Sequence, residues 1–266
     1  MSSGKRSKQR RRPPPPPPVS SRPRRASPRV LLAGGGAGLA AVVAIVLAVV
    51  LGGGSSQKTA STVPRVGSLA NALPGAAAVQ RLFAGIPQRG TTLGSPGAPI
   101  TLVVYVDLQC PFCKELETQV MPGIVRRYVR PGKLRIVLRP WAFIGPDSVR
   151  GQAAVLAAAR QDKAFDLAEV LYDNQGTENS GWLDRNMVVA AASSVPGLRV
   201  RKLLADMSSA SVQAAAAQVA SLVEADGVQG TPTVFVGKTG RHGSEVVLPS
   251  ATDAAPLVRA IRAAGG

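Results

Sequence analysis

Runs of apolar and polar positions predict a strand, a helix and a strand in the middle of the chain. Ile100–Val106 is almost entirely apolar and rich in β-branched residues, as expected of a strand buried on both faces. Apolar positions then recur at helical spacing from Leu116 to Tyr128, with a kink expected at Pro122-Gly123. Leu134–Leu138 predicts the second strand. This order predicts a parallel βαβ unit with a right-handed crossover.

The chain from about residue 147 to 226 is rich in alanine and follows a helical period, with no convincing strand. Expected breaks at 174–181, 196–197 and 208–209 divide it into three or four helices. Thr233–Val236 and Glu245–Leu248 then predict a hairpin, and Thr252–Ala263 predicts a last helix. The pattern indicates an α/β fold of the order β-α-β … β-β-α, with a helical insertion over about 147–226.

Val30–Leu51 has no charged side chain over 22 residues, which as a helix would extend about 33 Å and cross a bilayer core. The preceding residues 1–29 form a basic tail with a proline run at 13–18. Seven Lys or Arg residues lie within 20 positions before the apolar stretch and two within 20 after it. The positive-inside rule therefore predicts a cytoplasmic N-terminus and a C-terminal part outside the membrane.

A cleaved signal peptide is the alternative to this signal anchor. The apolar core of a signal peptide is shorter, about 7–15 residues, and a good small-residue cleavage site is missing, although Gly52 and Gly54 could serve. Both interpretations place the rest of the chain outside the cell membrane, where disulfides persist. Residues 52–91 are then predicted to be an extracytoplasmic linker with a short helix within 70–85, and the folded domain to span 92–266.

The net charge of +17 is mostly a property of the tail. Ten of the 32 basic residues lie within residues 1–30, which contain no Asp or Glu, so the other 236 residues carry 22 basic against 15 acidic side chains. The tail is followed by an apolar segment that directs it to a membrane surface. We therefore expect a membrane protein and no nucleic-acid partner.

Cys110-Pro111-Phe112-Cys113 contains the only cysteines of the chain. A disulfide between them closes so small a ring that it adds little stability, which favours a chemical over a structural role. Cys110 opens the predicted helix, where unpaired N–H groups lower the pKa of a thiol. Cys110 is therefore predicted to be the exposed nucleophile and Cys113, one turn further along, the resolving thiol.

A metal site is not expected. A closed zinc site needs four ligands, and the single histidine, His242, stands in a Gly- and Arg-rich turn where we expect it to be solvated. A hydrolytic Cys–His pair is disfavoured for the same reason.

Residues 93–101 and 105–113 closely resemble the entry strand and active site of DsbA-like thiol:disulfide oxidoreductases. Further similar motifs are Met121-Pro122, Gly132-Lys133-Leu134, Tyr172-Asp173-Asn174-Gln175 and Gly227-Val228-Gln229-Gly230-Thr231-Pro232-Thr233. The resemblance covers the chain from about residue 92 to its end. It implies a thioredoxin fold with an inserted helical domain.

The resemblance also implies roles for single residues. Pro232 is expected to be cis and to face the cysteines, with the Thr231 backbone available to pair with a substrate segment. Glu117 matches an acidic residue that could relay protons, although an exposed carboxylate on a helix face is an equal alternative; Asp107 is interpreted as a strand-end or cap residue. Phe112 departs from the family because the best-known members have histidine there, so a strongly oxidising potential is not implied.

The sequence therefore predicts a membrane-anchored, extracytoplasmic thiol:disulfide oxidoreductase with no cofactor beyond its redox-active disulfide. Expected partners are cysteine-containing protein substrates and a membrane or secreted redox partner. Residues 55–91 offer no convincing dimerisation module, so we expect a monomer. A reductase or isomerase of the same fold and a non-catalytic extracytoplasmic binding module remain the alternatives.

Overall fold

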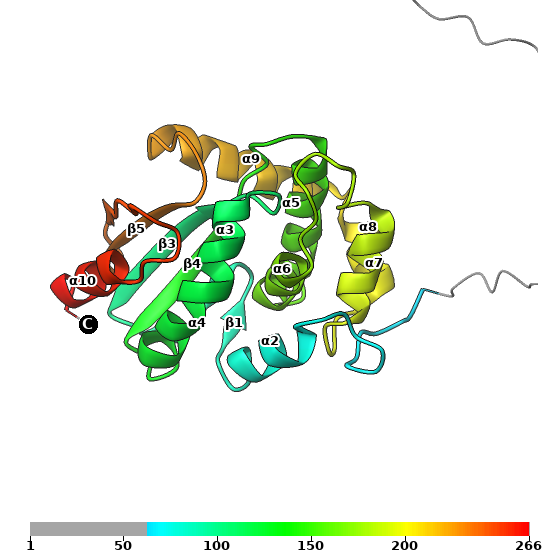
Figure 1. Ribbon diagram of the computed structural model, residues 1–266, viewed down its shortest axis with the longest axis horizontal. Coiled ribbons are helices and arrows are strands. Elements are labelled where there is room, and N and C mark those ends of the chain that lie inside the picture. Colours follow the sequence, from blue (N-terminus) through cyan, green and yellow to red (C-terminus); the bar gives the residue numbers. More distant parts are fainter. Residues whose placement is uncertain (1–62, 266) are drawn as a thin grey trace, which may run out of the picture. The chain divides into compact units, whose positions relative to one another are not determined.

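The computed structural model describes residues 63–265 of the chain. Its centre is a six-stranded sheet in the order β1-β2-β4-β3-β5-β6 (Figure 1). The strands are β1 (Gln88–Arg89), β2 (Thr92–Leu93), β3 (Ile100–Val106), β4 (Leu134–Pro140), β5 (Thr233–Lys238) and β6 (Ser244–Glu245). The predicted thioredoxin-like α/β fold with a helical insertion is confirmed.

The predicted βαβ unit forms as expected. β3 and β4 run parallel over their whole length, from Ile100 opposite Leu134 to Val106 opposite Pro140. β5 pairs with the other edge of β3 in the antiparallel sense. β3 is therefore a central strand, which explains its nearly continuous apolar run.

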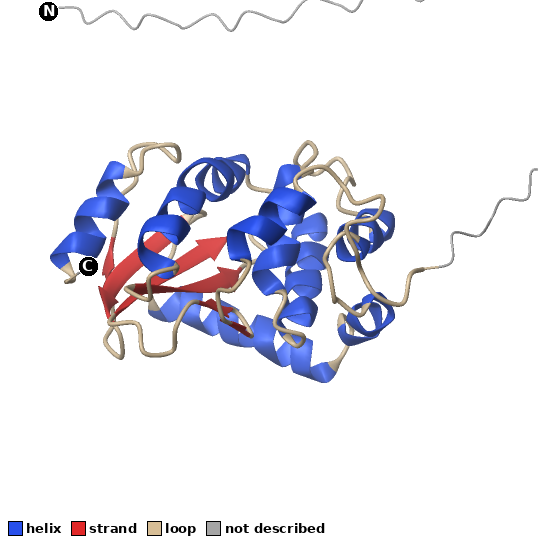
Figure 2. Cartoon of the chain, turned by 90° about the horizontal axis from the view of Figure 1, so that it is seen from below, coloured by secondary structure: helices blue, strands red, loops and turns tan. Residues whose placement is uncertain are grey.

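Alternate residues of the central strands enter two different cores. Leu102 and Val104 of β3 belong to the main core, with the helix after β3 and with α10 (Ala255–Ala263). Tyr105 of β3 and Phe235 of β5 belong to a smaller core under α9 (Ala210–Ala225). Helices accordingly cover both faces of the sheet (Figure 2).

The helix after β3 consists of α3 (Pro111–Glu115), η1 (Leu116–Val120), α4 (Met121–Ile124) and η2 (Val125–Val129), of which η1 and η2 are π-helical. The expected irregularity at Pro122 has a direct cause, since proline has no N–H to donate within the helix. The N–H of the preceding residue, Met121, donates to the Leu116 carbonyl, five residues back, where an α-helix would use the carbonyl four residues back. The irregularity is thus a pair of wider turns around the proline.

The insertion contains five helices among the described residues, not three or four: α5 (Pro146–Ala159), α6 (Ala164–Asp173), α7 (Arg185–Ser193), α8 (Val200–Asp206) and α9. The break that the sequence analysis missed separates α5 from α6. Asp162 adopts a positive φ of 55° there. Aspartate tolerates this left-handed backbone, so the chain turns without glycine or proline.

The predicted linker boundary at residue 91 is wrong. Residues 63–91 belong to the folded unit: α2 (Ala76–Phe83) buries Val79 and Phe83 in the main core, and Val66 forms a bridge with Arg199. These short elements are held by contacts with distant parts of the chain. The helix expected within 70–85 is present as α2.

The predicted basic tail (1–29), membrane span (30–51) and first part of the linker (52–62) lie outside the described residues. Within residues 63–265, no helix combines the length and apolar character that a membrane crossing requires.

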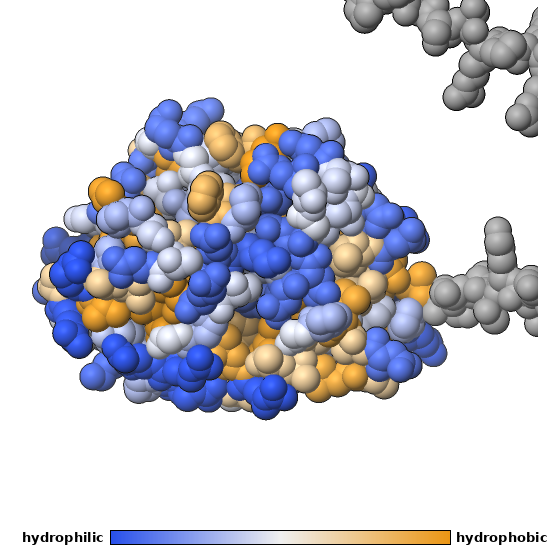
Figure 3. Space-filling model, viewed as in Figure 1, coloured by the Kyte–Doolittle hydropathy of each residue, from blue (hydrophilic) through white to orange (hydrophobic). Residues whose placement is uncertain are grey.

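Hydrophobic residues on the face shown in Figure 3 gather between α10 and α4 and beside α2, and the surface over α6 is mainly hydrophilic. Two exposed aromatic residues follow the carboxyl ends of the parallel strands. Phe112 comes after β3 and is 61% exposed, and Phe143 comes after β4 and is 49% exposed. This edge of the sheet also carries both cysteines.

Candidate active site

Cys110 is the N-cap of α3, immediately beyond the carboxyl end of β3. Its Sγ accepts a hydrogen bond from the Cys113 N–H at 3.3 Å, and Pro111 occupies the first helical turn. Both cysteines are free thiols. The sequence thus places a sulfur where a helix presents unpaired backbone donors, as predicted.

The Thr231–Pro232 bond is cis, as the resemblance implied, and this loop lies against Cys110. The Cys110 thiol donates to the Thr231 carbonyl, with 3.3 Å between Sγ and O. The loop covers the sulfur so well that Cys110 is only 4% exposed, so the expectation of an exposed nucleophile is wrong. Cys113 is fully buried, and Cys110 remains the more accessible of the two.

The surroundings separate the two thiols in acidity. The hydrogen bond with Cys113 lowers the pKa of Cys110 against the opposing effect of burial, and Thr231 and the backbone N–H groups of Cys113 and Phe112 lower it further, to about 6. Burial raises the pKa of Cys113 well above its usual value, and its hydrogen bond with Cys110 acts in the same direction. Cys110 is therefore the thiolate at neutral pH, and Cys113 keeps its proton.

Side chains from distant parts of the chain fix the loop before Cys110. The buried Asp107 carboxylate accepts hydrogen bonds from the N–H groups of Gln109, Phe143 and Ile144 at 2.8–2.9 Å. The interpretation of Asp107 as a strand-end residue is confirmed, and it also ties the loops after β3 and β4 together.

The end of α6 holds the carbonyl groups of the same loop. The Tyr172 hydroxyl donates to the Asp107 carbonyl at 3.1 Å, and Gln175 Nε2 donates to the carbonyls of Leu108 at 2.8 Å and Cys110 at 3.2 Å. The helical insertion thus sets the position of the redox loop directly.

Glu117 is buried in η1, so the alternative of an exposed helix-face carboxylate is wrong. Its neighbour is Glu169 of α6, which is also buried and close enough for the two carboxyl groups to affect each other's pKa. Burial raises the pKa of both carboxyl groups, and for Glu169 the charge of Glu117 adds to the effect. The pair therefore holds a proton where isolated carboxyl groups would hold none. Burial also raises the pKa of the Tyr172 phenol.

Phe112 is exposed and lines a groove of about 350 Å³ beside the Thr231–Pro232 loop that covers Cys110. The groove is lined by Phe112, Glu115, Thr231, Pro232 and the segment Leu248–Ala251. Its walls combine apolar side chains with the backbone of the cis-proline loop, which suits an extended peptide.

His242 lies against Asp226 and the ring of Phe235. It is 68% exposed in its side chain, as predicted, but its Nε2 is 3.0 Å from Asp226 Oδ1. Asp226 also accepts from Tyr105 at 2.6 Å and from Arg139 at 2.7 Å. Within the described part of the chain, no cluster of His, Cys, Asp and Glu has a metal-binding arrangement.

The structure brings together Cys110, Cys113, Thr231, Pro232 and Phe112, and places Glu117 behind the thiols. Sequence reasoning missed Glu169 and the groove wall at 248–251. The motif Tyr172-Asp173-Asn174-Gln175 was noticed only as a resemblance, and its two end residues prove to hold the redox loop.

Comparison with known proteins agrees with this geometry. A family model described as thioredoxin matches residues 88–246. The probable disulfide bond formation protein D of Bacillus cereus is 27% identical over 148 residues, which cover 54% of this chain and 68% of the relative.

Two solved structures share the fold. BdbD from Bacillus subtilis, in its oxidised form, superposes with a TM-score of 0.58 at 20% identity, covering 67% of this chain and 96% of that one. A thioredoxin-like oxidoreductase from Silicibacter pomeroyi DSS-3 gives 0.50 at 26% identity, covering 70% and 96%.

Proposed function

The chain belongs to the thioredoxin family, and on this premise we propose that it is a thiol:disulfide oxidoreductase that exchanges disulfides with protein substrates. The observation that carries the proposal is the contrast between the two thiols. Cys110 lies at a helix N-terminus with a pKa of about 6, and Cys113 lies directly behind it with a raised pKa. The relatives described as disulfide bond formation proteins support the assignment.

The reaction starts from the Cys110–Cys113 disulfide. A substrate thiolate attacks Cys110 Sγ, the bond between the two cysteines breaks, and Cys113 leaves with the electron pair. A second substrate thiolate attacks the substrate sulfur of this mixed disulfide and releases Cys110 as a thiolate. The substrate loses two electrons, and the cysteine pair gains them.

Cys113 must take up a proton when it leaves, because its raised pKa makes a free thiolate unstable. We assign the donor to the Glu117–Glu169 pair, which holds a proton behind the thiols. Glu117 is thus a proton-relay residue in this mechanism, and Glu169 sets its protonation state. The same pair takes the proton back when Cys113 attacks in the reverse direction.

The substrate segment lies in the groove beside Cys110. It pairs with the backbone at Thr231, next to Pro232, as an added strand. Phe112 and Leu248 supply apolar contacts on either side. The redox-active disulfide needs no further cofactor, and the proposed active species is a monomer.

We place this domain outside the cell membrane, anchored by Val30–Leu51, with a membrane or secreted redox partner. The support is the charge asymmetry around that apolar stretch. Protease added to intact spheroplasts should remove the domain and leave a short membrane-bound stub. A domain protected until lysis would contradict this topology.

Trapping of mixed disulfides tests the chemistry. Cys113→Ala should accumulate reductant-sensitive adducts with substrate proteins, because the thiol that resolves them is missing. Cys110→Ala is the matched control and should accumulate few. The reverse pattern would assign the nucleophile to Cys113, and no adducts in either variant would favour the non-catalytic binding module.

The direction of electron flow is a separate question, answered by the redox state of the cysteines in intact cells. Mostly oxidised cysteines, detected by alkylation shift, support net oxidation of substrates. Mostly reduced cysteines would make the protein a reductase or an isomerase of the same fold.

A further inference from the structure

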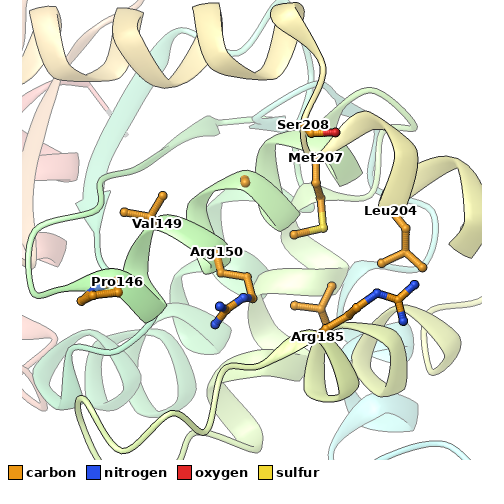
Figure 4. Close-up of a pocket in the computed structure, with 9 residues that line it drawn as sticks. Pro146, Val149, Arg150, Arg185, Leu204, Met207 and Ser208 are labelled. Atoms are coloured by element: carbon orange, nitrogen blue, oxygen red, sulfur yellow. The ribbon is translucent and has the colours of Figure 1, made fainter.

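A second groove opens on the helical insertion, between α5, α7 and α8, with a volume of about 460 Å³ (Figure 4). It is lined by Pro146, Val149, Arg150, Ala153, Arg185, Val188, Leu204, Met207 and Ser208. In Figure 4, Val149 and Arg150 come from the α5 side, Leu204 and Met207 from the α8 side, and Arg185 from α7. The reaction described above uses none of these residues.

The walls of the groove are apolar and accessible. Val149 is 59% exposed, and the side chains of Leu204 and Met207 are only half-buried. Exposed apolar side chains around a concavity mark a binding surface more often than a random position does. The groove is therefore suited to the apolar side chains of a polypeptide segment.

Two arginines give the groove a charge preference. Arg150 is held in place, since its Nη1 donates to Asp147 Oδ1 at 3.1 Å and to the Leu183 carbonyl at 2.7 Å. Arg185 is exposed, and among residues 63–265 no carboxylate lies within ion-pairing distance of it. A guanidinium group presents paired donors that match a carboxylate. The occupant that complements this groove carries a carboxylate beside its apolar groups.

The groove is connected to the redox centre through one buried side chain. Gln109, the residue before Cys110, donates from Nε2 to Ser148 Oγ at 2.9 Å. Ser148 lies in the first turn of α5, between the groove residues Pro146 and Val149. The exposed Phe143 precedes this turn, and its N–H is bound by Asp107. The first turn of α5 thus contacts the redox loop on one side and contributes to the groove on the other.

We propose that this groove is a second substrate site, which binds an apolar segment carrying Asp or Glu in the polypeptide joined to Cys110. The proposal rests on the proposed disulfide exchange. Arg185 pairs with the substrate carboxylate, and Val149, Leu204 and Met207 contact the neighbouring apolar side chains. The site would favour acidic over basic sequences near the reacting cysteine.

The test compares model peptides that contain one cysteine and a short apolar segment. The segment carries either glutamate or lysine, and its distance from the cysteine is varied across a series of peptides. The rate of mixed-disulfide formation with the oxidised protein is measured by stopped flow, with dithiothreitol as a thiol too small to reach the groove. In the wild type, a glutamate peptide should react faster than its lysine counterpart. Arg185→Glu should slow the glutamate peptide about fivefold, in the range of an exposed ion pair replaced by repulsion, and leave the dithiothreitol rate unchanged.

Arg201→Glu is the matched control, because Arg201 is an exposed arginine of α8 outside the groove. Arg201→Glu makes the same charge change and should leave the preference for glutamate peptides intact. Arg185→Lys keeps the positive charge and should retain part of this preference. Equal slowing by Arg201→Glu, or no slowing by Arg185→Glu, would overturn the proposal.

Two other occupants have distinct signatures. Decanoate binding without peptide discrimination would assign the groove to a fatty acid, and a dimer dissolved by Arg185→Glu would assign it to a second copy of the chain. Either result overturns the proposal. If the wild type fails to oxidise dithiothreitol, the proposed function is wrong. Binding of the same peptides to the groove is then measured separately by fluorescence anisotropy, with and without Arg185→Glu.

Discussion

The low pKa of Cys110 predicts a break in the pH dependence of the reduction potential. With a pKa of about 6, Cys110 is about 90% thiolate at pH 7, against about 1% for a thiol at 9.0. This preference stabilises the folded dithiol form by up to about 1.4 kcal/mol at pH 7. The figure is an upper limit, because the remaining exposure of Cys110 lets water screen part of the thiolate charge.

The sign follows from the depressed pKa. The stabilisation is fully present above the unfolded pKa near 9 and is lost as the pH falls through 6. The oxidised form has no thiol to titrate, so only the dithiol form gains. At pH 7, this makes the protein more oxidising than a dithiol with ordinary pKa values by up to about 30 mV.

The number of protons taken up on reduction gives a sharper test than the absolute potential. Below pH 6, reduction takes up two protons, and the potential should fall by about 59 mV per pH unit. Above pH 6, only Cys113 takes a proton, and the slope should halve to about 30 mV. Glutathione equilibration between pH 5 and pH 8 measures both slopes.

The variant Cys113→Ala provides the control, titrated by ultraviolet thiolate absorbance. It removes the side chain that lowers the Cys110 pKa most, so Cys110 of the variant should titrate at a higher pH than Cys110 of the wild type. A single slope of 59 mV up to pH 8 would show that Cys110 keeps its proton and would refute the assignment of the thiolate.

The other predictions concern groups around the same sulfur. Thr231→Val should raise the pKa of Cys110, because the Thr231 side chain is one of the groups that lower it; thiolate titration measures the shift. Phe112→His should lower that pKa and make the protein more oxidising, by adding a donor or positive charge at the helix N-terminus; an unchanged potential would contradict this. Glu117→Gln should slow reduction of the disulfide by a dithiol, because an amide cannot pass a proton to Cys113, with little effect on thiolate titration. Asp107→Asn should lower the free energy of unfolding by about 1.5–3 kcal/mol, the range for hydrogen bonds to a charged group; urea denaturation measures it.

Much of the fold could be predicted because the central strands are buried on both faces and therefore have continuous apolar sequences. Leu102, Val104 and Tyr105 are buried whichever face they point to, so β3 had to be a continuous apolar run. The glycines of the 237–240 turn likewise indicated the hairpin, and Gly240 adopts a φ of 82°. Its second strand is Ser244–Glu245, however, and not the expected Glu245–Leu248. Such features depend on local sequence alone.

The N-terminal boundary could not be predicted in the same way. β1 and β2 have two residues each and exist only through pairing, β2 with β4 and β1 with β2. Gly67 approaches the helical insertion so closely that a Cβ there would lie 2.2 Å from the Val195 carbonyl oxygen. Tertiary contact creates these elements, and no periodicity reveals them.

The difference in acidity between Cys110 and Cys113 depends on one feature that is local in sequence and on another that only the fold creates. The acidity of Cys110 comes mainly from its own helix turn, through Cys113 and the following N–H groups, so four adjacent residues were enough to predict its direction. The proton store behind it joins Glu117 to Glu169, which come from different helices and have ordinary sequence surroundings. Only folding buries these two carboxyl groups side by side, and burial is the main cause of the raised pKa of each. The nucleophile can therefore be predicted from the motif, whereas the control of its partner's proton depends on Glu169 of the insertion, which only the fold brings to Glu117.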